Sequence, residues 1–171
     1  MARFPVSLLI TAAFLYPARR AFPSETQPAQ AKADRVLVLK KERKLILLSG
    51  EKELKTYRIS LGGDAVGPKQ REGDHKTPEG TYVLDRRNPH SKFYRSIHIS
   101  YPNQKDRRRA QRLGAPPGGD IFVHGLPNGF GWVSKSHIAR DWTDGCIAVT
   151  DAEMDEIWRA VPDGTPIEIR P

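Results

Sequence analysis

This sequence of 171 residues has one cysteine, Cys146, and that scarcity excludes several classes of protein. A single thiol cannot form an internal disulfide, so the fold does not depend on a disulfide framework. The chain also lacks a short pair of ligands with the spacing usual for zinc, and we therefore expect neither a metal ion nor a cofactor. A lone thiol without these roles is a candidate for reactivity, although a free cysteine is also often a small buried hydrophobe.

Long hydrophobic runs are scarce as well. The apolar run that follows Arg3, residues 4–16, is shorter than the roughly 20 apolar residues of a membrane-spanning helix, so we expect no stable membrane span. Its proportions are those of a secretory signal, which indicates an exported protein, periplasmic or associated with the cell wall. Small residues suited to cleavage surround Ala31. We interpret residues 1–31 as signal peptide and linker, and residues 32–171 as one domain.

Acidic side chains are fewer than basic ones. The counts are 20 Asp and Glu against 28 Lys and Arg, which gives a formal net charge of +8 and favours an anionic partner. An exported protein does not meet genomic nucleic acid, and no base-stacking or groove-reading motif is present, so we expect no nucleic-acid partner. A cell-wall polymer is the better anionic partner, and we expect a monomer.

Most of the chain consists of short apolar or alternating segments between turn residues, which is typical of a β-dominated domain. Alternation is clearest over residues 95–101, where Ile97, Ile99 and Tyr101 share one face. The predicted strands cover residues 36–40, 44–49, 54–60, 81–85, 96–101, 120–124, 146–150 and 166–170.

Two short helices complete the expected fold. Residues 151–161 carry apolar side chains on one helical stripe, and Thr150 with Glu153 matches a capping box. A more polar helix is predicted over residues 104–113, after Asn103 as its N-cap.

Two long connections, residues 62–80 and 126–143, join the predicted strands. Loops of this length inside compact domains are usually functional or disordered. We expect these two loops to form the walls of a substrate cleft.

His124 is the candidate base for Cys146. A thiol attacks a carbonyl only as the thiolate, so it needs a base within reach or a lowered pKa. His124 ends an apolar strand, and Gly125 would let the backbone turn and leave the imidazole at the exposed end of that strand. Gly145 removes a side chain where a substrate backbone would approach, and backbone N–H groups near Cys146 could hold a developing oxyanion. We therefore assign Gly125 and Gly145 to oxyanion and backbone support in an acyl transfer.

The motif formed by these residues resembles a known family. His124-Gly125, the long spacer and Thr143-x-Gly145-Cys146, together with Thr77-Pro78-x-Gly80, are similar to the catalytic domain of L,D-transpeptidases of the YkuD type. The resemblance covers residues 36–170 and implies an L,D-transpeptidase-like β-sandwich with a helix near its C-terminal end. It also implies the reaction, in which Cys146 attacks the carbonyl before a D-residue of a peptidoglycan stem peptide, and an amine resolves the thioester.

One position departs from the commonest form of the family motif. A histidine or another basic residue usually precedes Gly-Cys, whereas this sequence has Asp144, and a carboxylate there opposes thiolate formation. Asp144 either points away to orient a histidine or the loop, or marks a branch that acts on another bond or acceptor. Thr143, Asp144 and His137 are therefore candidates for substrate binding or orientation, with His137 lining the pocket or positioning Asp144.

Four functions stay open at this point. The leading one is a peptidoglycan L,D-transpeptidase that crosslinks or modifies stem peptides, with an amine of a wall-anchored lipoprotein as one candidate acceptor. A cysteine hydrolase, an amidase or endopeptidase, would use the same thioester with water as the acceptor. A basic wall-binding domain would leave Cys146 structural. A metal site built from His124, His137, Asp144 and Cys146 is the weakest of the four.

Overall fold

The computed structural model describes residues 31–171, so the predicted signal peptide and nearly all of the predicted linker lie outside the described residues. The described chain is mainly β, as predicted, and contains all eight predicted strands and both predicted helices. The elements in chain order are β1 (Arg35–Leu39), β2 (Lys44–Ser49), β3 (Lys52–Arg58), β4 (Gly80–Ser91), β5 (Tyr94–Ile99), α1 (Gln104–Arg112), β6 (Ile121–His124), the 3-10 segment η1 (Gly131–Ala139), β7 (Ile147–Ala148), α2 (Asp151–Ala160) and β8 (Thr165–Arg170).

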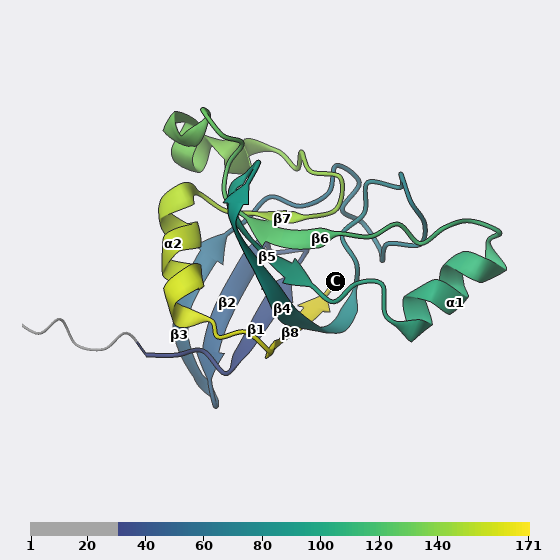
Figure 1. The fold of residues 1–171 in the computed structure, drawn as a ribbon, viewed down its shortest axis with the longest axis horizontal. Coiled ribbons are helices and arrows are strands. Elements are labelled where there is room, and N and C mark those ends of the chain that lie inside the picture. Colours follow the sequence, from purple (N-terminus) through teal and green to yellow (C-terminus); the bar gives the residue numbers. More distant parts are fainter. Residues whose placement is uncertain (1–30) are drawn as a thin grey trace, which may run out of the picture.

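The eight strands form one continuous sheet that curls on itself (Figure 1). Their order is β3-β2-β1-β8-β4-β5-β6-β7; β1 is parallel to β8, β6 is parallel to β7, and the other neighbours are antiparallel. Ser60, just after edge strand β3, exchanges two backbone hydrogen bonds of 3.0 and 2.9 Å with Ala148 of the opposite edge strand β7. The two edges therefore meet, and the apolar side chains of the strands form one core.

The two helices lie at opposite ends of the curled sheet (Figure 1). Helix α2 begins at the predicted capping box, in which Glu153 accepts from the backbone N–H of Thr150 (2.9 Å), and it buries Met154 and Ile157 in the core beside β5. Helix α1 is largely exposed, as its polar sequence predicts, and begins at the N-cap Asn103.

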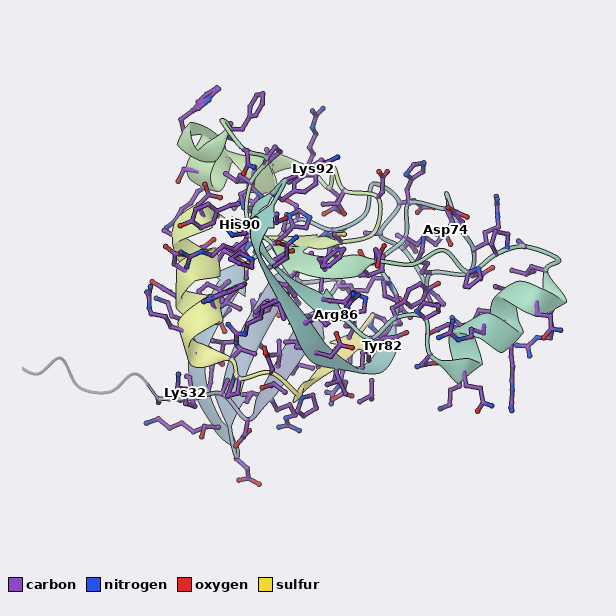
Figure 2. The ribbon with its side chains drawn as sticks, in the orientation of Figure 1. Lys32, Asp74, Tyr82, Arg86, His90 and Lys92 are labelled. Atoms are coloured by element: carbon purple, nitrogen blue, oxygen red, sulfur yellow. The ribbon has the colours of Figure 1, made fainter. Side chains whose placement is uncertain are left out.

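Strand β4 continues to Ser91, well beyond its predicted end. The prediction stopped early because two bulges interrupt the alternation of side chains on which it rested. Figure 2 shows Tyr82, Arg86 and His90 following one another along this strand, with Lys92 in the turn beyond it. The extra length brings the turn between β4 and β5 to the edge of the site described below.

A buried lysine ties the loop of residues 62–80 to the sheet. Lys40 is 2% exposed, and its Nζ donates to the Gly67 carbonyl (2.6 Å), the Thr77 carbonyl (2.9 Å) and Glu79 Oε1 (2.8 Å). Burial lowers the pKa of Lys40, while the hydrogen bond and charge of Glu79 act in the opposite direction. The loop is therefore held by three contacts to one cation.

Candidate active site

Cys146 and His124 lie on neighbouring strands. Strands β6 and β7 are parallel, with His124 opposite Ala148, so Cys146 directly precedes β7 at the level of Phe122. Both side chains line one cavity of about 370 Å³. Cys146 is half-buried, so its sulfur is not enclosed in the core. The fold thus brings together the two residues expected to react, despite their separation along the chain.

The imidazole of His124 is neutral and held in one tautomer. Its Nδ1 lies 2.6 Å from the carbonyl oxygen of Gly125, an acceptor, so Nδ1 carries the proton and Nε2 keeps a lone pair. The ring packs against Phe93, with centroids 4.5 Å apart, and edge-on against Trp142 at 5.9 Å. Burial lowers the pKa of His124 to about 4, and nearby His137 lowers it further, against the hydrogen bond to Gly125. The predicted position at the exposed end of the strand is wrong, since His124 is only 3% exposed.

The thiol of Cys146 is also neutral in its resting state. Its Sγ is 3.8 Å from the carbonyl oxygen of Asp120, to which it donates. Burial is the largest influence on the Cys146 thiol and raises its pKa. The backbone N–H of Phe122 and the charge of Lys69 act to lower this pKa, whereas the charges of Asp144 and Asp120 raise it further. A neutral thiol and a neutral imidazole that line one cavity can react by transfer of one proton, and a preformed ion pair is not favoured.

Thr143 fixes the backbone around the thiol. Its hydroxyl donates to the carbonyl of Cys146 (2.8 Å) and accepts from the backbone N–H of Gly145 (3.1 Å). Gly145 has a φ of +127°, and a Cβ there would lie 2.6 Å from the carbonyl oxygen of Lys76. The close approach predicted for a substrate backbone at Gly145 is therefore made by the protein's own chain.

The amides of Gly125 and Gly145 are both engaged. The N–H of Gly125 donates to the carbonyl of Arg95 (3.2 Å), and that of Gly145 donates to Thr143 Oγ1. A Cβ at Gly125 would lie 2.7 Å from Asp151 Oδ1, so this glycine makes room for the start of α2. Both backbone N–H groups are therefore engaged within the protein, and the predicted oxyanion and backbone support at these glycines stays a prediction. The amide beside the sulfur belongs to Phe122.

Asp144 contacts the loop of residues 62–80 and also lines the cysteine cavity. Its Oδ1 lies 2.8 Å from Nδ1 of His75, and the Asp144 side chain is 92% exposed. His137 does not position Asp144; its Nδ1 lies 3.1 Å from Ser60 Oγ, and its ring lines another cavity. Of the two interpretations of Asp144, the geometry matches the one in which it orients a histidine, and that histidine is His75.

The walls of the cysteine cavity differ from the two predicted loops. The loop of residues 126–143 contributes Trp142 and Thr143, whereas none of its lining residues comes from the loop of residues 62–80. That loop instead packs against Gly145 through the backbone of Lys76. The turn between β4 and β5 supplies Lys92 and Phe93 instead. The sequence carried no signal for this, because the turn is placed there by the antiparallel pairing of β5 with the strand of His124.

The described residues also bear on other classes of function. Over residues 31–171, no group of three or more His, Cys, Asp or Glu side chains is arranged to hold a metal ion. No helix within the same part of the chain is long and apolar enough to cross a membrane.

Comparison with known proteins identifies one family. The model of the YkuD family, described as the L,D-transpeptidase catalytic domain, matches residues 33–169. The protein named "Putative L,D-transpeptidase YafK" from Escherichia coli strain K12 is 34% identical over 132 residues, which cover 74% of this chain and 46% of YafK. The chain therefore spans about half the length of the curated relatives that it matches.

Solved structures agree with this fold. The helical cell shape determining protein Pgp2 from Campylobacter jejuni is 27% identical with a TM-score of 0.59, and the match covers 79% of this chain and 46% of Pgp2. The L,D-transpeptidase from Xylanimonas cellulosilytica is 18% identical with a TM-score of 0.54, over 84% of this chain and 63% of that one. The second likeness concerns the fold alone.

Proposed function

This chain belongs to the YkuD family of L,D-transpeptidase catalytic domains, and we propose that it is a peptidoglycan L,D-transpeptidase that crosslinks or modifies stem peptides through a thioester on Cys146. One observation carries the proposal: the half-buried thiol of Cys146 and the neutral imidazole of His124 line a single cavity. The names of its relatives support the reaction class, since YafK is named for this activity and Pgp2 for determining cell shape.

In the first step, His124 acts as a general base. Its Nε2 takes the proton of the Cys146 thiol while sulfur attacks the carbonyl carbon that precedes a D-residue, and a C–S bond forms. Backbone N–H groups around the thiol, among them that of Phe122, stabilise the oxyanion. When the tetrahedral intermediate collapses, the C–N bond breaks, and the imidazolium gives its proton to the leaving amine.

In the second step, an amine resolves the thioester. The acceptor nitrogen attacks the carbonyl carbon, His124 takes a proton from it, and the C–S bond breaks. The imidazolium then returns the proton to the thiolate of Cys146. Water in place of the amine gives a carboxylic acid by the same sequence of proton transfers, which is the hydrolytic alternative.

Thr143 and Gly145 are positioning residues in this scheme. The Thr143 hydroxyl bonds the backbone N–H of Gly145 and the carbonyl of Cys146, which fixes the turn that carries the thiol. Gly145 allows that turn to lie against the Lys76 carbonyl. Thr143→Val should therefore lower kcat with little effect on KM, and Thr143→Ser, which keeps the hydroxyl, should restore activity. Equal loss in both variants would contradict the positioning role.

The central test uses purified protein and a muropeptide that carries a tetrapeptide. We expect release of the terminal D-residue and an acyl-enzyme detectable as an added mass on Cys146. Cys146→Ala should abolish both, and His124→Asn should slow turnover by about 10²- to 10⁴-fold, the usual contribution of a general base. Activity that survives Cys146→Ala would end the thiol mechanism.

Product analysis distinguishes transfer from hydrolysis. With an added acceptor amine, or with a wall-anchored lipoprotein that offers a free amine, a transpeptidase gives a crosslinked product that mass spectrometry detects. Free acids alone, in every acceptor condition, would favour the cysteine hydrolase.

We further propose that the protein acts as a monomer outside the cytoplasm, in the periplasm or at the cell wall. Intact mass of the protein recovered from the cell envelope should correspond to removal of the residues up to a site near Ala31. Recovery of the full chain from the cytoplasmic fraction alone would contradict export.

A further inference from the structure

Two large aromatic side chains, Phe130 and Trp132, are exposed on the connection between β6 and β7. Phe130 is 54% exposed and Trp132 is 79% exposed. The other exposed large apolar side chains of the described chain, Val66, Val83 and Leu113, lie far apart along the sequence. Single exposed apolar residues are normal, but two aromatic rings that flank one glycine on a short segment indicate a surface with a partner.

The segment that carries these rings, η1, has a packed backbone. Figure 1 shows η1 beyond the start of α2, at the opposite end of the molecule from α1. A Cβ at Gly131 would lie 2.6 Å from Asp151 Oδ2, so the backbone between the two rings lies against the first turn of α2. Among residues 31–171, neither Phe130 nor Trp132 stacks on another aromatic ring. The rings therefore face solvent from a fixed position.

The cations of the same connection are exposed as well. Neither Lys135 nor Arg140 joins an ion pair within the part of the chain that the structure describes. Lys92 is a third exposed cation, and its carbonyl accepts from the backbone N–H of Asn128 in this connection (3.0 Å). Residues 126–140 include no Asp or Glu. The name η1 surface is used below for Phe130, Trp132, Lys135 and Arg140.

The charge of the η1 surface distinguishes between the partners that could cover its rings. A symmetric interface between two copies would set this surface against itself, so Lys135 and Arg140 would face cations with no carboxylate of the connection to pair them. An uncharged glycan would leave both cations without a partner. An anionic lipid surface matches both features, because its phosphates attract cations while aromatic rings lie at the boundary between headgroups and acyl chains.

We propose that the η1 surface is a peripheral binding site for an anionic lipid bilayer. Phe130 and Trp132 enter the boundary between headgroups and acyl chains, and Lys135 and Arg140 pair with lipid phosphates. This binding function involves neither Cys146 nor its cavity wall at His124, so it is independent of the proposed reaction.

Helix α1 is the other basic surface of the molecule, and it matches a bilayer less well. It carries more exposed cations than η1, namely Lys105, Arg107, Arg108 and Arg112. Its sequence has no aromatic side chain, so it lacks the apolar half of the match. This helix therefore provides a control for attraction by charge alone.

The direct test is the fluorescence of the purified protein mixed with vesicles. We expect the emission of Trp132 to move to shorter wavelength with vesicles of phosphatidylglycerol and phosphatidylcholine, and lipids brominated in their acyl chains should quench it. The chain has three tryptophans, so the signal of Trp132 is the difference between the original protein and Trp132→Phe. Vesicles of phosphatidylcholine alone should give a smaller change, and raising the salt from about 0.1 M to about 0.5 M should weaken binding.

One pair of variants measures the apolar contribution. Trp132→Ser should weaken binding to the anionic vesicles about tenfold, and Trp132→Phe, which keeps an aromatic ring, should bind nearly as the original protein does. Val66→Ser is the matched control, since Val66 is 81% exposed and lies in the loop of residues 62–80, and it should not change the affinity. All variants keep the same N-terminal residues, so the apolar run of residues 4–16 does not account for a difference between them.

A second pair of variants measures the contribution of charge. Lys135→Gln combined with Arg140→Gln should weaken vesicle binding about tenfold or more, because each cation beside an anionic bilayer contributes to the affinity. Arg107→Gln combined with Arg108→Gln removes the same charge from the exposed face of α1 and should have a clearly smaller effect. Every substituted side chain is exposed, and circular dichroism checks that each variant is folded.

Three results would overturn the proposal. The first is an unchanged emission of Trp132 with anionic vesicles, whether or not the protein sediments with them. The second is an equal loss of binding in the two charge variants, which would assign the attraction to net charge alone. The third is a dimer in the absence of vesicles that Trp132→Ser dissociates in analytical ultracentrifugation, which would assign the surface to a second copy of the chain. None of these measurements depends on activity, so a failure here is distinct from a failure of the muropeptide assay.

Discussion

Acidification should destabilise this protein largely through one buried residue, His124. Burial lowers its pKa to about 4 in the folded protein, whereas an unfolded histidine titrates near 6.5. Between these two values the unfolded chain binds a proton that the folded chain does not. The stability contributed by the neutral imidazole is therefore complete above about pH 6.5 and is lost as the pH falls toward 4.

The size of the effect follows from the two pKa values. Lowering the pH from about 7 to about 4.5 should reduce the free energy of unfolding by about 2.5 kcal/mol through His124 alone. No discount for solvent applies, since the side chain is 3% exposed. Burial also lowers the pKa of His137, which adds to the loss. Asp74 acts only at lower pH: burial would raise its pKa, but hydrogen bonds from Lys69 and backbone amides lower it to about 2.

Urea unfolding at the two pH values measures the effect. His124→Asn keeps an N–H donor for the Gly125 carbonyl but does not titrate, so its stability should change with pH by about 2.5 kcal/mol less than that of the original protein. His90→Leu, at an exposed histidine, should keep the original pH dependence. The reasoning would be refuted by an equal pH dependence in the protein with His124 and the variant without it, since the imidazole would then be charged, or freely accessible to protons, in the folded state.

Three further predictions concern the loop and the thiol. Gly145→Ala should destabilise the protein by about 2 to 5 kcal/mol in urea unfolding, because it adds backbone strain and a clash with the Lys76 carbonyl. The control Gly63→Ala should leave stability unchanged, since a Cβ there meets nothing within 4 Å. Equal stability of the two variants would contradict the packing at Gly145. The rate of Cys146 alkylation by iodoacetamide should keep rising with pH beyond the ordinary pKa range of cysteine, because burial raises the pKa of this thiol. Asp144→Asn removes a negative charge that also raises this pKa, so it should increase the rate at pH 8 about two- to threefold. A plateau of the rate near neutral pH would instead indicate a thiolate–imidazolium pair. Lys40→Met should lower the free energy of unfolding in urea by about 3 to 5 kcal/mol, because it leaves the partly buried Glu79 carboxylate and the carbonyls of Gly67 and Thr77 without this donor. A loss below about 1 kcal/mol would mean that Lys40 does not hold the loop.

Local pattern was sufficient for the order of secondary structure. Each predicted strand has a run of apolar or alternating side chains bounded by turn residues, and these short-range signals persist whatever the tertiary contacts are. The capping box of Thr150 and Glu153 located the start of α2 to the residue, because both partners lie within one turn. Strand β4 was truncated in the prediction because its bulges interrupt the alternation on which the prediction rested.

The candidate site was predictable in its chemistry but not in its hydrogen bonds. A single thiol and a histidine at the end of an apolar strand are visible in the sequence, as is the resemblance of their motif to a family. The sequence did not show that the backbone N–H groups of Gly125 and Gly145 have partners within the protein, because those partners, the Arg95 carbonyl and the Thr143 hydroxyl, are set by pairing between strands and by the turn itself. The pairing of Asp144 with His75 likewise joins residues far apart in the chain.

The sequence by itself determined the β-rich fold, the helix after Thr150 and the identity of the two candidate reactive side chains, because those depend on residue type and on neighbours within a few positions. Only the tertiary structure decided that the sheet edges meet at Ser60 and Ala148, that the His124 imidazole is neutral, and that Trp142 separates two cavities. Each of these depends on burial and on contacts between segments distant in the chain. Burial and long-range contact exist only once the chain has folded.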